Sequence, residues 1–126
     1  MLGYVLVFFG AGIGGALRHG INLSTARTFG TVFPYGTLTV NIVGSLVMGV
    51  FAGYFAFRGD AAQTWRLFLT TGILGGFTTF STFSLDTALL YERGELGLTL
   101  LYVAVSFACS IGALFMGLWA VRGLVQ

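Results

Sequence analysis

The sequence predicts an all-α membrane protein with four transmembrane helices, and three observations support this fold class. Hydrophobic residues make up 56% of the 126 residues and charged residues only 8%, whereas a soluble domain usually carries about 25% charge. The charged residues gather in short clusters between long uncharged stretches. These stretches are continuous instead of alternating, which makes the strands of a membrane barrel the weaker interpretation. The same composition excludes a disordered chain and a nucleic-acid-binding surface.

Each apolar stretch is long enough to cross the hydrocarbon core, which takes about 20 residues. We expect spans at roughly residues 2–26, 34–57, 65–91 and 97–122, which together form one domain over residues 1–126. No basic residue precedes the first stretch, so a cleaved signal peptide is not expected.

The first span contains an arginine, Arg18, at a depth where a charged residue indicates function. Arg18 could give a vestibule a positive potential that draws anions in, or its side chain could snorkel to the membrane surface. His19 beside it has no second histidine in the chain with which to bind a metal. The single cysteine, Cys109, excludes an intrachain disulfide.

Close helix packing is predicted from small residues in the first two spans. Two glycine pairs are spaced by four residues: Gly10 with Gly14, and Gly49 with Gly53. Small residues at this spacing let membrane helices approach closely. Most of these glycines are therefore expected to serve helix packing.

The third span is expected to be broken near mid-membrane. The 25 residues from Leu67 to Tyr91 would measure about 37 Å as one helix, which exceeds a core of about 30 Å. Several poor helix formers stand together there: Gly72, Gly75, Gly76, Thr78 and Thr79. A break would free carbonyls for a cation, or amides for an anion. The alternative is a continuous helix whose hydroxyls bond to their own backbone.

Polar side chains recur inside the predicted spans, where they indicate function or contacts between helices. Two sets are spaced four residues apart, which places each set on one helical face: Thr37, Asn41 and Ser45 in the second span, and Tyr102, Ser106 and Ser110 in the fourth. The third span carries a dense run of hydroxyls and rings from Thr78 to Ser84. Within it, Phe80 and Phe83 could present positive ring edges to an anion, although core packing is the commoner role of such a pair.

The arginines on the two sides of the membrane nearly balance. Alternate loops place Arg58, Arg66 and Arg122 on one side, and Arg27 and Arg93 on the other, joined by Arg18 if it snorkels. This balance predicts insertion in both orientations, from which an antiparallel dimer would follow. A single orientation set by one arginine is the alternative.

These motifs resemble those of the Fluc (CrcB) family of small fluoride channels, and the resemblance covers the whole chain. Residues 72–84 resemble the third-span signature closely, residues 36–41 with Gly44 resemble the second-span motif, and residues 14–18 resemble the first. Tyr102, Ser106 and Ser110 match the fourth-span pattern less specifically. Asp86 stands where an acid, often glutamate, is usual, and His19 replaces a commonly aromatic residue.

The resemblance implies passive fluoride efflux through two pores of an antiparallel, dual-topology homodimer in the plasma (inner) membrane of a prokaryote. Phe80 and Phe83 from opposite subunits would line each pore, with Asn41 as a polar contact and Arg18 in the vestibule. Further candidates along the pathway are Thr37, Thr79, Ser81, Thr82, Tyr102, Ser106 and Ser110. A structural sodium ion would be held by the backbone carbonyls of Gly75 and Thr78 from both subunits. No organic cofactor is implied.

Three other classes of protein fit the sequence less well. A small multidrug exporter uses a glutamate in its first span, and residues 1–26 contain no acid, although proton-coupled flux through Asp86 stays conceivable. A non-transporting assembly subunit would use its polar faces only to hold helices together. An enzyme is the least expected, because the serines and threonines have only one histidine and scattered acids as possible bases.

Overall fold

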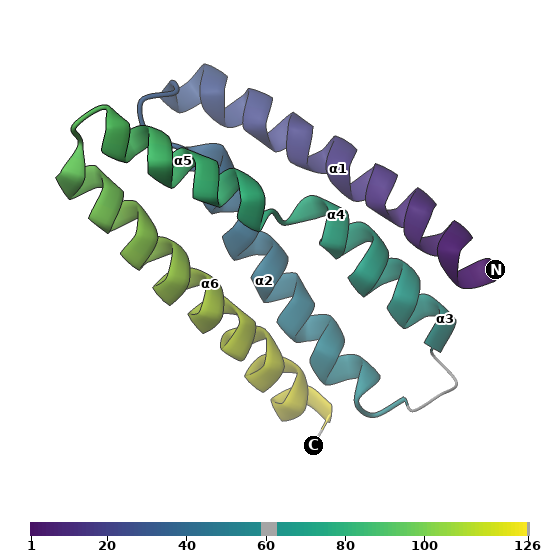
Figure 1. Ribbon diagram of the computed structural model, residues 1–126. Helices are drawn as coiled ribbons and strands as arrows, with labels where there is room; N and C mark the ends of the chain where they lie inside the picture. The colour runs from purple at the N-terminus through teal and green to yellow at the C-terminus, as the bar shows by residue number, and fades with distance from the viewer. Residues whose placement is uncertain (59–62, 126) are drawn as a thin grey trace.

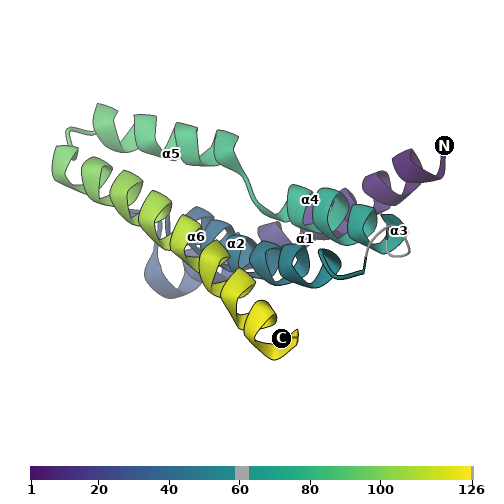
Figure 2. The same cartoon turned by 90° about the horizontal axis from the view of Figure 1, so that it is seen from below.

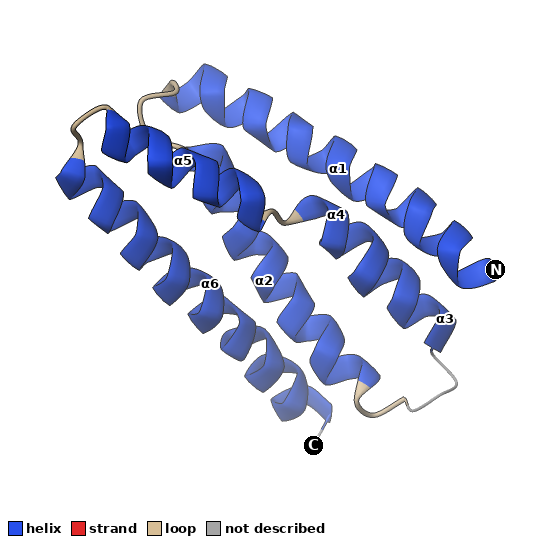
Figure 3. Cartoon of the chain, viewed as in Figure 1, coloured by secondary structure: helices blue, strands red, loops and turns tan. Residues whose placement is uncertain are grey.

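The computed structural model describes residues 1–58 and 63–125. The described chain is helical throughout, with short connections and no strand, which confirms the all-α fold class (Figure 3). In chain order the helices are α1 (Leu2–Phe29), α2 (Tyr35–Phe55), α3 (Gln63–Arg66), η2 (Leu67–Leu74), α4 (Gly75–Phe77), α5 (Phe80–Glu92) and α6 (Leu96–Val125) (Figure 1). Gly30 and Gly94, which follow α1 and α5, adopt positive φ angles of 81° and 79° that glycine tolerates without strain.

Three of the described helices combine the length and the apolar composition needed to cross a membrane. They are Leu2–Phe29, Tyr35–Phe55 and Leu96–Leu124. Large apolar side chains such as Phe8, Leu100 and Trp119 are more than half exposed on them, as lipid-facing side chains are. The chain is therefore a multi-pass membrane protein. The predicted span 65–91 is instead divided among shorter helices.

Backbone contacts at glycines bring the long helices together. α2 packs along α6, and α1 packs along η2 and α4. A Cβ atom at Gly49 would overlap the carbonyl oxygen of Leu114 in α6, and one at Gly14 would overlap the carbonyl oxygen of Ile73. A Cβ atom at Gly10 would likewise overlap the backbone of η2, whereas one at Gly53 would lie 3.2 Å from the Val121 side chain of α6. The packing role predicted for these glycines is confirmed.

Two residues between α4 and α5 leave the helical conformation. Thr78 has φ −83° and ψ 158°, and Thr79 has φ −154° and ψ 113°, so both are extended. The chain resumes as α5 along a displaced axis, and Figure 2 shows α5 stepping away from the line of α3 and α4. The hydroxyl of Thr79 caps α5 by accepting a hydrogen bond from the Thr82 N–H at 3.2 Å, the usual role of threonine at this position.

The buried apolar core is divided by this interruption into two small clusters. Val40, Leu74 and Phe77 form one between α2 and the η2–α4 segment. Phe83, Leu90 and Tyr102 form the other between α5 and α6. Each half of the interrupted segment therefore has its own packing partner, which fixes the position of the two extended threonines between them.

Candidate functional site

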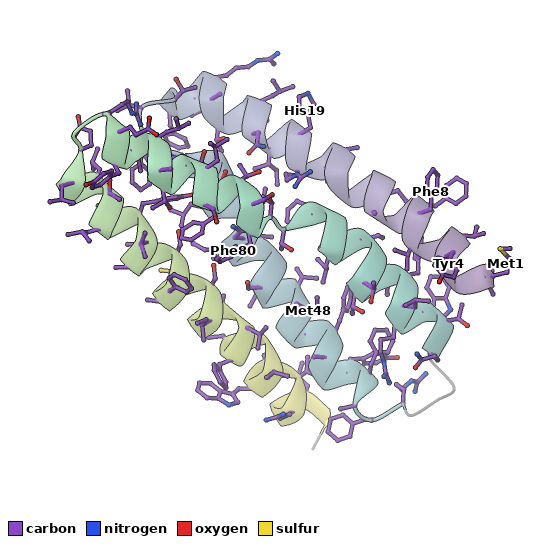
Figure 4. The ribbon with its side chains drawn as sticks, viewed as in Figure 1. Met1, Tyr4, Phe8, His19, Met48 and Phe80 are labelled. Carbon is purple, nitrogen blue, oxygen red and sulfur yellow. The ribbon has the colours of Figure 1, made fainter. Side chains whose placement is uncertain are left out.

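A cavity of about 330 Å³ lies beside Thr78 and Thr79, between α2, α5 and α6. Figure 4 labels two of its lining side chains, Phe80 of α5 and Met48 of α2. The lining combines aromatic and aliphatic side chains with a few hydroxyls and one amide: Asn41, Gly44, Ser45, Met48, Thr78, Thr79, Phe80, Phe83, Ser106, Phe107, Ser110, Ile111 and Leu114. A mostly apolar cavity with a few convergent polar groups is typical of a small-ligand site.

Six of the ten side chains expected along an ion pathway line this one cavity. They are Asn41, Thr79, Phe80, Phe83, Ser106 and Ser110. The hydroxyl oxygens of Ser106 and Ser110 are buried and have no hydrogen-bond partner in the described chain. Because buried polar atoms are nearly always paired, these two hydroxyls mark a place for a polar occupant.

The two phenylalanines differ sharply in exposure. Phe83 is 7% exposed, and its ring meets the Phe107 ring edge-on at 5.7 Å between centroids. Phe80 is 68% exposed, although its ring centroid lies only 5.5 Å from that of Phe83. One ring is thus buried inside the chain, while the other extends from its surface.

Two backbone carbonyls at the interruption lose the partners that a continuous helix would give them. The Thr79 N–H, which would bond to the Gly75 carbonyl, donates instead to Asn41 Oδ1 at 2.8 Å. The Thr82 N–H, which would bond to the Thr78 carbonyl, donates instead to Thr79 Oγ1 at 3.2 Å. Neutral carbonyl oxygens released at an unwound helix are a donor set suited to sodium. The residues present therefore fit the cation that the sequence resemblance implies.

The other expected pathway residues lie elsewhere. Thr37 and Thr82 line a second cavity of about 260 Å³, which also includes Asn22, Thr25 and Asp86. Ser81 is exposed, with its hydroxyl 3.4 Å from that of Thr79. Tyr102 is fully buried, and its hydroxyl donates to Asp86 Oδ2 at 3.2 Å.

Asp86, Arg18 and His19 are polar residues to which the sequence alone assigns no single role. Asp86 accepts the bond from Tyr102 of α6 and forms no ion pair with Arg18 in the described chain. Arg18 is half-buried on α1. His19 is exposed and points away from the other helices (Figure 4).

Sequence reasoning missed some of the cavity lining. Ser45 lies on the helical face of Asn41, as its four-residue spacing indicates, but it is not among the residues that the family resemblance places along the pore. Met48 and Phe107 also line the cavity. Their apolar character gives no signal that separates them from lipid-facing residues.

Comparison with known proteins gives one consistent result. The family model described as "CrcB-like protein, Camphor Resistance (CrcB)" matches residues 5–118. "Fluoride-specific ion channel FluC 2" of Nitrobacter hamburgensis is 59% identical over 123 residues, covering 98% of this chain and 99% of that protein. "Fluoride-specific ion channel FluC" of Rhodopseudomonas palustris is 59% identical over 121 residues, covering 96% and 98%. The protein of that name from Granulibacter bethesdensis is 53% identical over 126 residues, covering 100% and 99%.

Proposed function

The chain belongs to the CrcB-like protein family, and from this premise we propose that it is a fluoride channel that lets fluoride leave a prokaryotic cell passively across its inner membrane. Relatives that are 53–59% identical over nearly the whole chain are named as fluoride-specific ion channels. Because ion channels are not enzymes, the chain is not an enzyme. The observation that carries the proposal is the cavity in which two unpaired serine hydroxyls meet the rings of Phe80 and Phe83.

Fluoride passage requires many weak contacts in place of water. Transferring an ion into a medium of low dielectric costs tens of kcal/mol unless other groups replace its hydration. Ring edges carry partial positive charge, and hydroxyl and amide hydrogens can point at an anion. The cavity supplies all three kinds of contact, through Phe80, Ser106 and Asn41 among others. None is a fixed positive charge, which favours the release that conduction needs.

A second copy of the chain, in antiparallel orientation, would complete the pathway. The exposure of Phe80 supports this, because a ring edge serves as a pore contact only when something covers its far side. Two copies related by a two-fold axis would form two equivalent pores at their interface. The near balance of arginines on the two sides of the membrane supports insertion in both orientations.

A structural sodium ion would join the two copies at their axis. The carbonyls of Gly75 and Thr78 have given up their helical partners, and two copies would supply four such oxygens. Gly75 is exposed in the single chain, which supports its access to a shared site. The bound cation would hold the copies together and add positive potential near the anion path.

Fluoride content of living cells tests the proposed function. In a bacterium that lacks its own fluoride export, expression of this protein should lower internal fluoride and restore growth in fluoride medium. Asn41→Asp, expressed to the same level, should protect less because its charge opposes an anion. Internal fluoride equal to that of cells without the protein would contradict the proposal.

A further inference from the structure

Asn41 connects α2 to the helix interruption through two hydrogen bonds. Its Oδ1 accepts from the backbone N–H of Thr79 at 2.8 Å, and its Nδ2 donates to the carbonyl of the same residue at 3.1 Å. An asparagine amide has two hydrogens on nitrogen, so one remains to face the cavity that Asn41 lines. Much of the hydrogen-bonding capacity of the side chain is therefore used on the extended backbone between α4 and α5.

Gly44, three residues further along α2, allows this close approach. A Cβ atom at Gly44 would overlap the methyl group of Thr78 and lie 3.2 Å from the ring of Phe77. Without that atom, α2 lies directly against the extended segment. Asn41 thus binds the backbone of Thr79, and Gly44 leaves room for the side chain of Thr78 against α2.

The Thr79 N–H has a competing acceptor within its own segment. In an uninterrupted helix it would donate to the carbonyl of Gly75, four residues earlier. Thr79 is only 8% exposed. Without Asn41 its N–H would be an unsatisfied buried donor, which destabilises the folded protein. A return to the Gly75 carbonyl is the shortest way to avoid that cost, and it would extend the helix across the interruption.

We propose that Asn41 is a positioning residue whose amide withholds the Thr79 N–H from the Gly75 carbonyl and so keeps that carbonyl free to bind a cation. The inference rests on the proposed function, in which the carbonyls of Gly75 and Thr78 hold sodium. Asn41 then sets sodium affinity through the backbone of Thr79 without contacting the ion. This role adds to the contact that its remaining amide hydrogen can make in the cavity.

Sodium-dependent thermal stability of the purified protein tests the inference without measuring flux. A ligand that binds only the folded state raises the unfolding midpoint as its concentration rises. Sodium concentration is varied by exchanging sodium chloride for N-methylglucamine chloride, which keeps the ionic strength constant. Asn41→Ala should need about tenfold more sodium than the parent protein for the same rise, as expected for one lost hydrogen bond. Asn22→Ala, at the only other asparagine, is the matched control and should keep the parental response.

A backbone substitution separates positioning from general loss of structure. Replacing Thr79 by its α-hydroxy acid turns the N–H into an ester oxygen and keeps every side chain. It also makes the Thr78 carbonyl, a proposed sodium ligand, an ester carbonyl, so the effect of Asn41→Ala is measured within the ester background, which must itself still respond to sodium. Neither Asn41 nor Gly75 can then accept this hydrogen. Asn41→Ala in the ester background should therefore match the sodium response of the ester alone within about twofold. Asn41→Leu, which keeps the side-chain volume, replaces Asn41→Ala if the alanine variant does not fold.

Two results would overturn the positioning role: a parental sodium response in Asn41→Ala, or the same loss of response with and without the ester. A parent protein whose stability does not respond to sodium at all would remove the proposed sodium site, and the inference with it. Fluoride conduction, measured separately in liposomes, would still stand in that case. The failure of the inference and the failure of the channel proposal are thus distinguishable.

Discussion

At the residue scale, the exposed ring of Phe80 offers a test of ring electrostatics. Phe80→Ile keeps an apolar side chain of similar bulk but removes the positive ring edge. We expect fluoride efflux from liposomes to fall about tenfold, which corresponds to the loss of one favourable ring contact. Phe8→Ile, at a similarly exposed ring on α1, is the control and should conduct at the parental rate. Parental efflux in Phe80→Ile would remove the ring from the pathway.

Ser106 permits a separation of activity from stability. Its buried hydroxyl has no partner in the described chain, so Ser106→Ala removes an unsatisfied polar atom and should leave the unfolding midpoint unchanged or slightly higher. The same variant should conduct fluoride several-fold more slowly, because an ion contact is lost. Thermal unfolding and liposome efflux on one preparation check both expectations. A lower midpoint together with unchanged efflux would assign the hydroxyl to structure.

Asn41→Asp places a negative charge beside the cavity and should suppress fluoride efflux at least about tenfold, because a like charge near the path repels the anion. Asn22→Asp makes the same change at a residue outside that cavity and should have a smaller effect. Efflux from liposomes at neutral pH compares the two. Undiminished efflux in Asn41→Asp would exclude this side chain from the neighbourhood of the moving ion.

At the element scale, the contact between α2 and α6 depends on glycine. Gly49→Ala would place a Cβ against the Leu114 carbonyl, and overpacking of this kind costs about 1–3 kcal/mol. Gly12→Ala on α1 would place a Cβ more than 4 Å from every other described residue outside its own stretch of helix, and it should be neutral or stabilising by up to about 1 kcal/mol, from helix propensity alone. Reversible unfolding in detergent measures both. Equal stability of the two variants would contradict the packing described for α2 and α6.

At this scale, rules that use only neighbouring residues predict the glycine contacts between helices, but they do not predict contacts between residues far apart in the chain. Glycine spacing predicts close packing because the small helix face that it creates involves only residues within one or two turns of the same helix. The acceptor of the Thr79 N–H was not predictable, because Asn41 lies 38 residues away. Thr37 and Thr82, candidates for the same pathway as Asn41, line a different cavity in the single chain. Their helical faces could be read from the sequence, whereas the neighbouring helix that each face meets depends on tertiary packing.

At the scale of the whole molecule, dual topology predicts a half-labelled population. In a Cys109→Ser background, Glu95→Cys places a thiol at an exposed position between α5 and α6. A membrane-impermeant maleimide applied to intact cells should label about half of the molecules, because balanced arginines give little preference for one orientation. Permeabilised cells, in which all molecules should react, provide the reference. Complete labelling or complete protection in intact cells would establish a single orientation.

The central claim is that this chain by itself forms a passive, fluoride-selective path, and anion release from liposomes tests it most directly. Liposomes that contain only the purified protein are loaded with potassium fluoride or potassium chloride, and valinomycin starts the release by balancing charge. The account predicts rapid release of fluoride with chloride retained. Retention of both ions by folded, dimeric protein would contradict it, and would favour a subunit whose polar faces serve only to hold helices together.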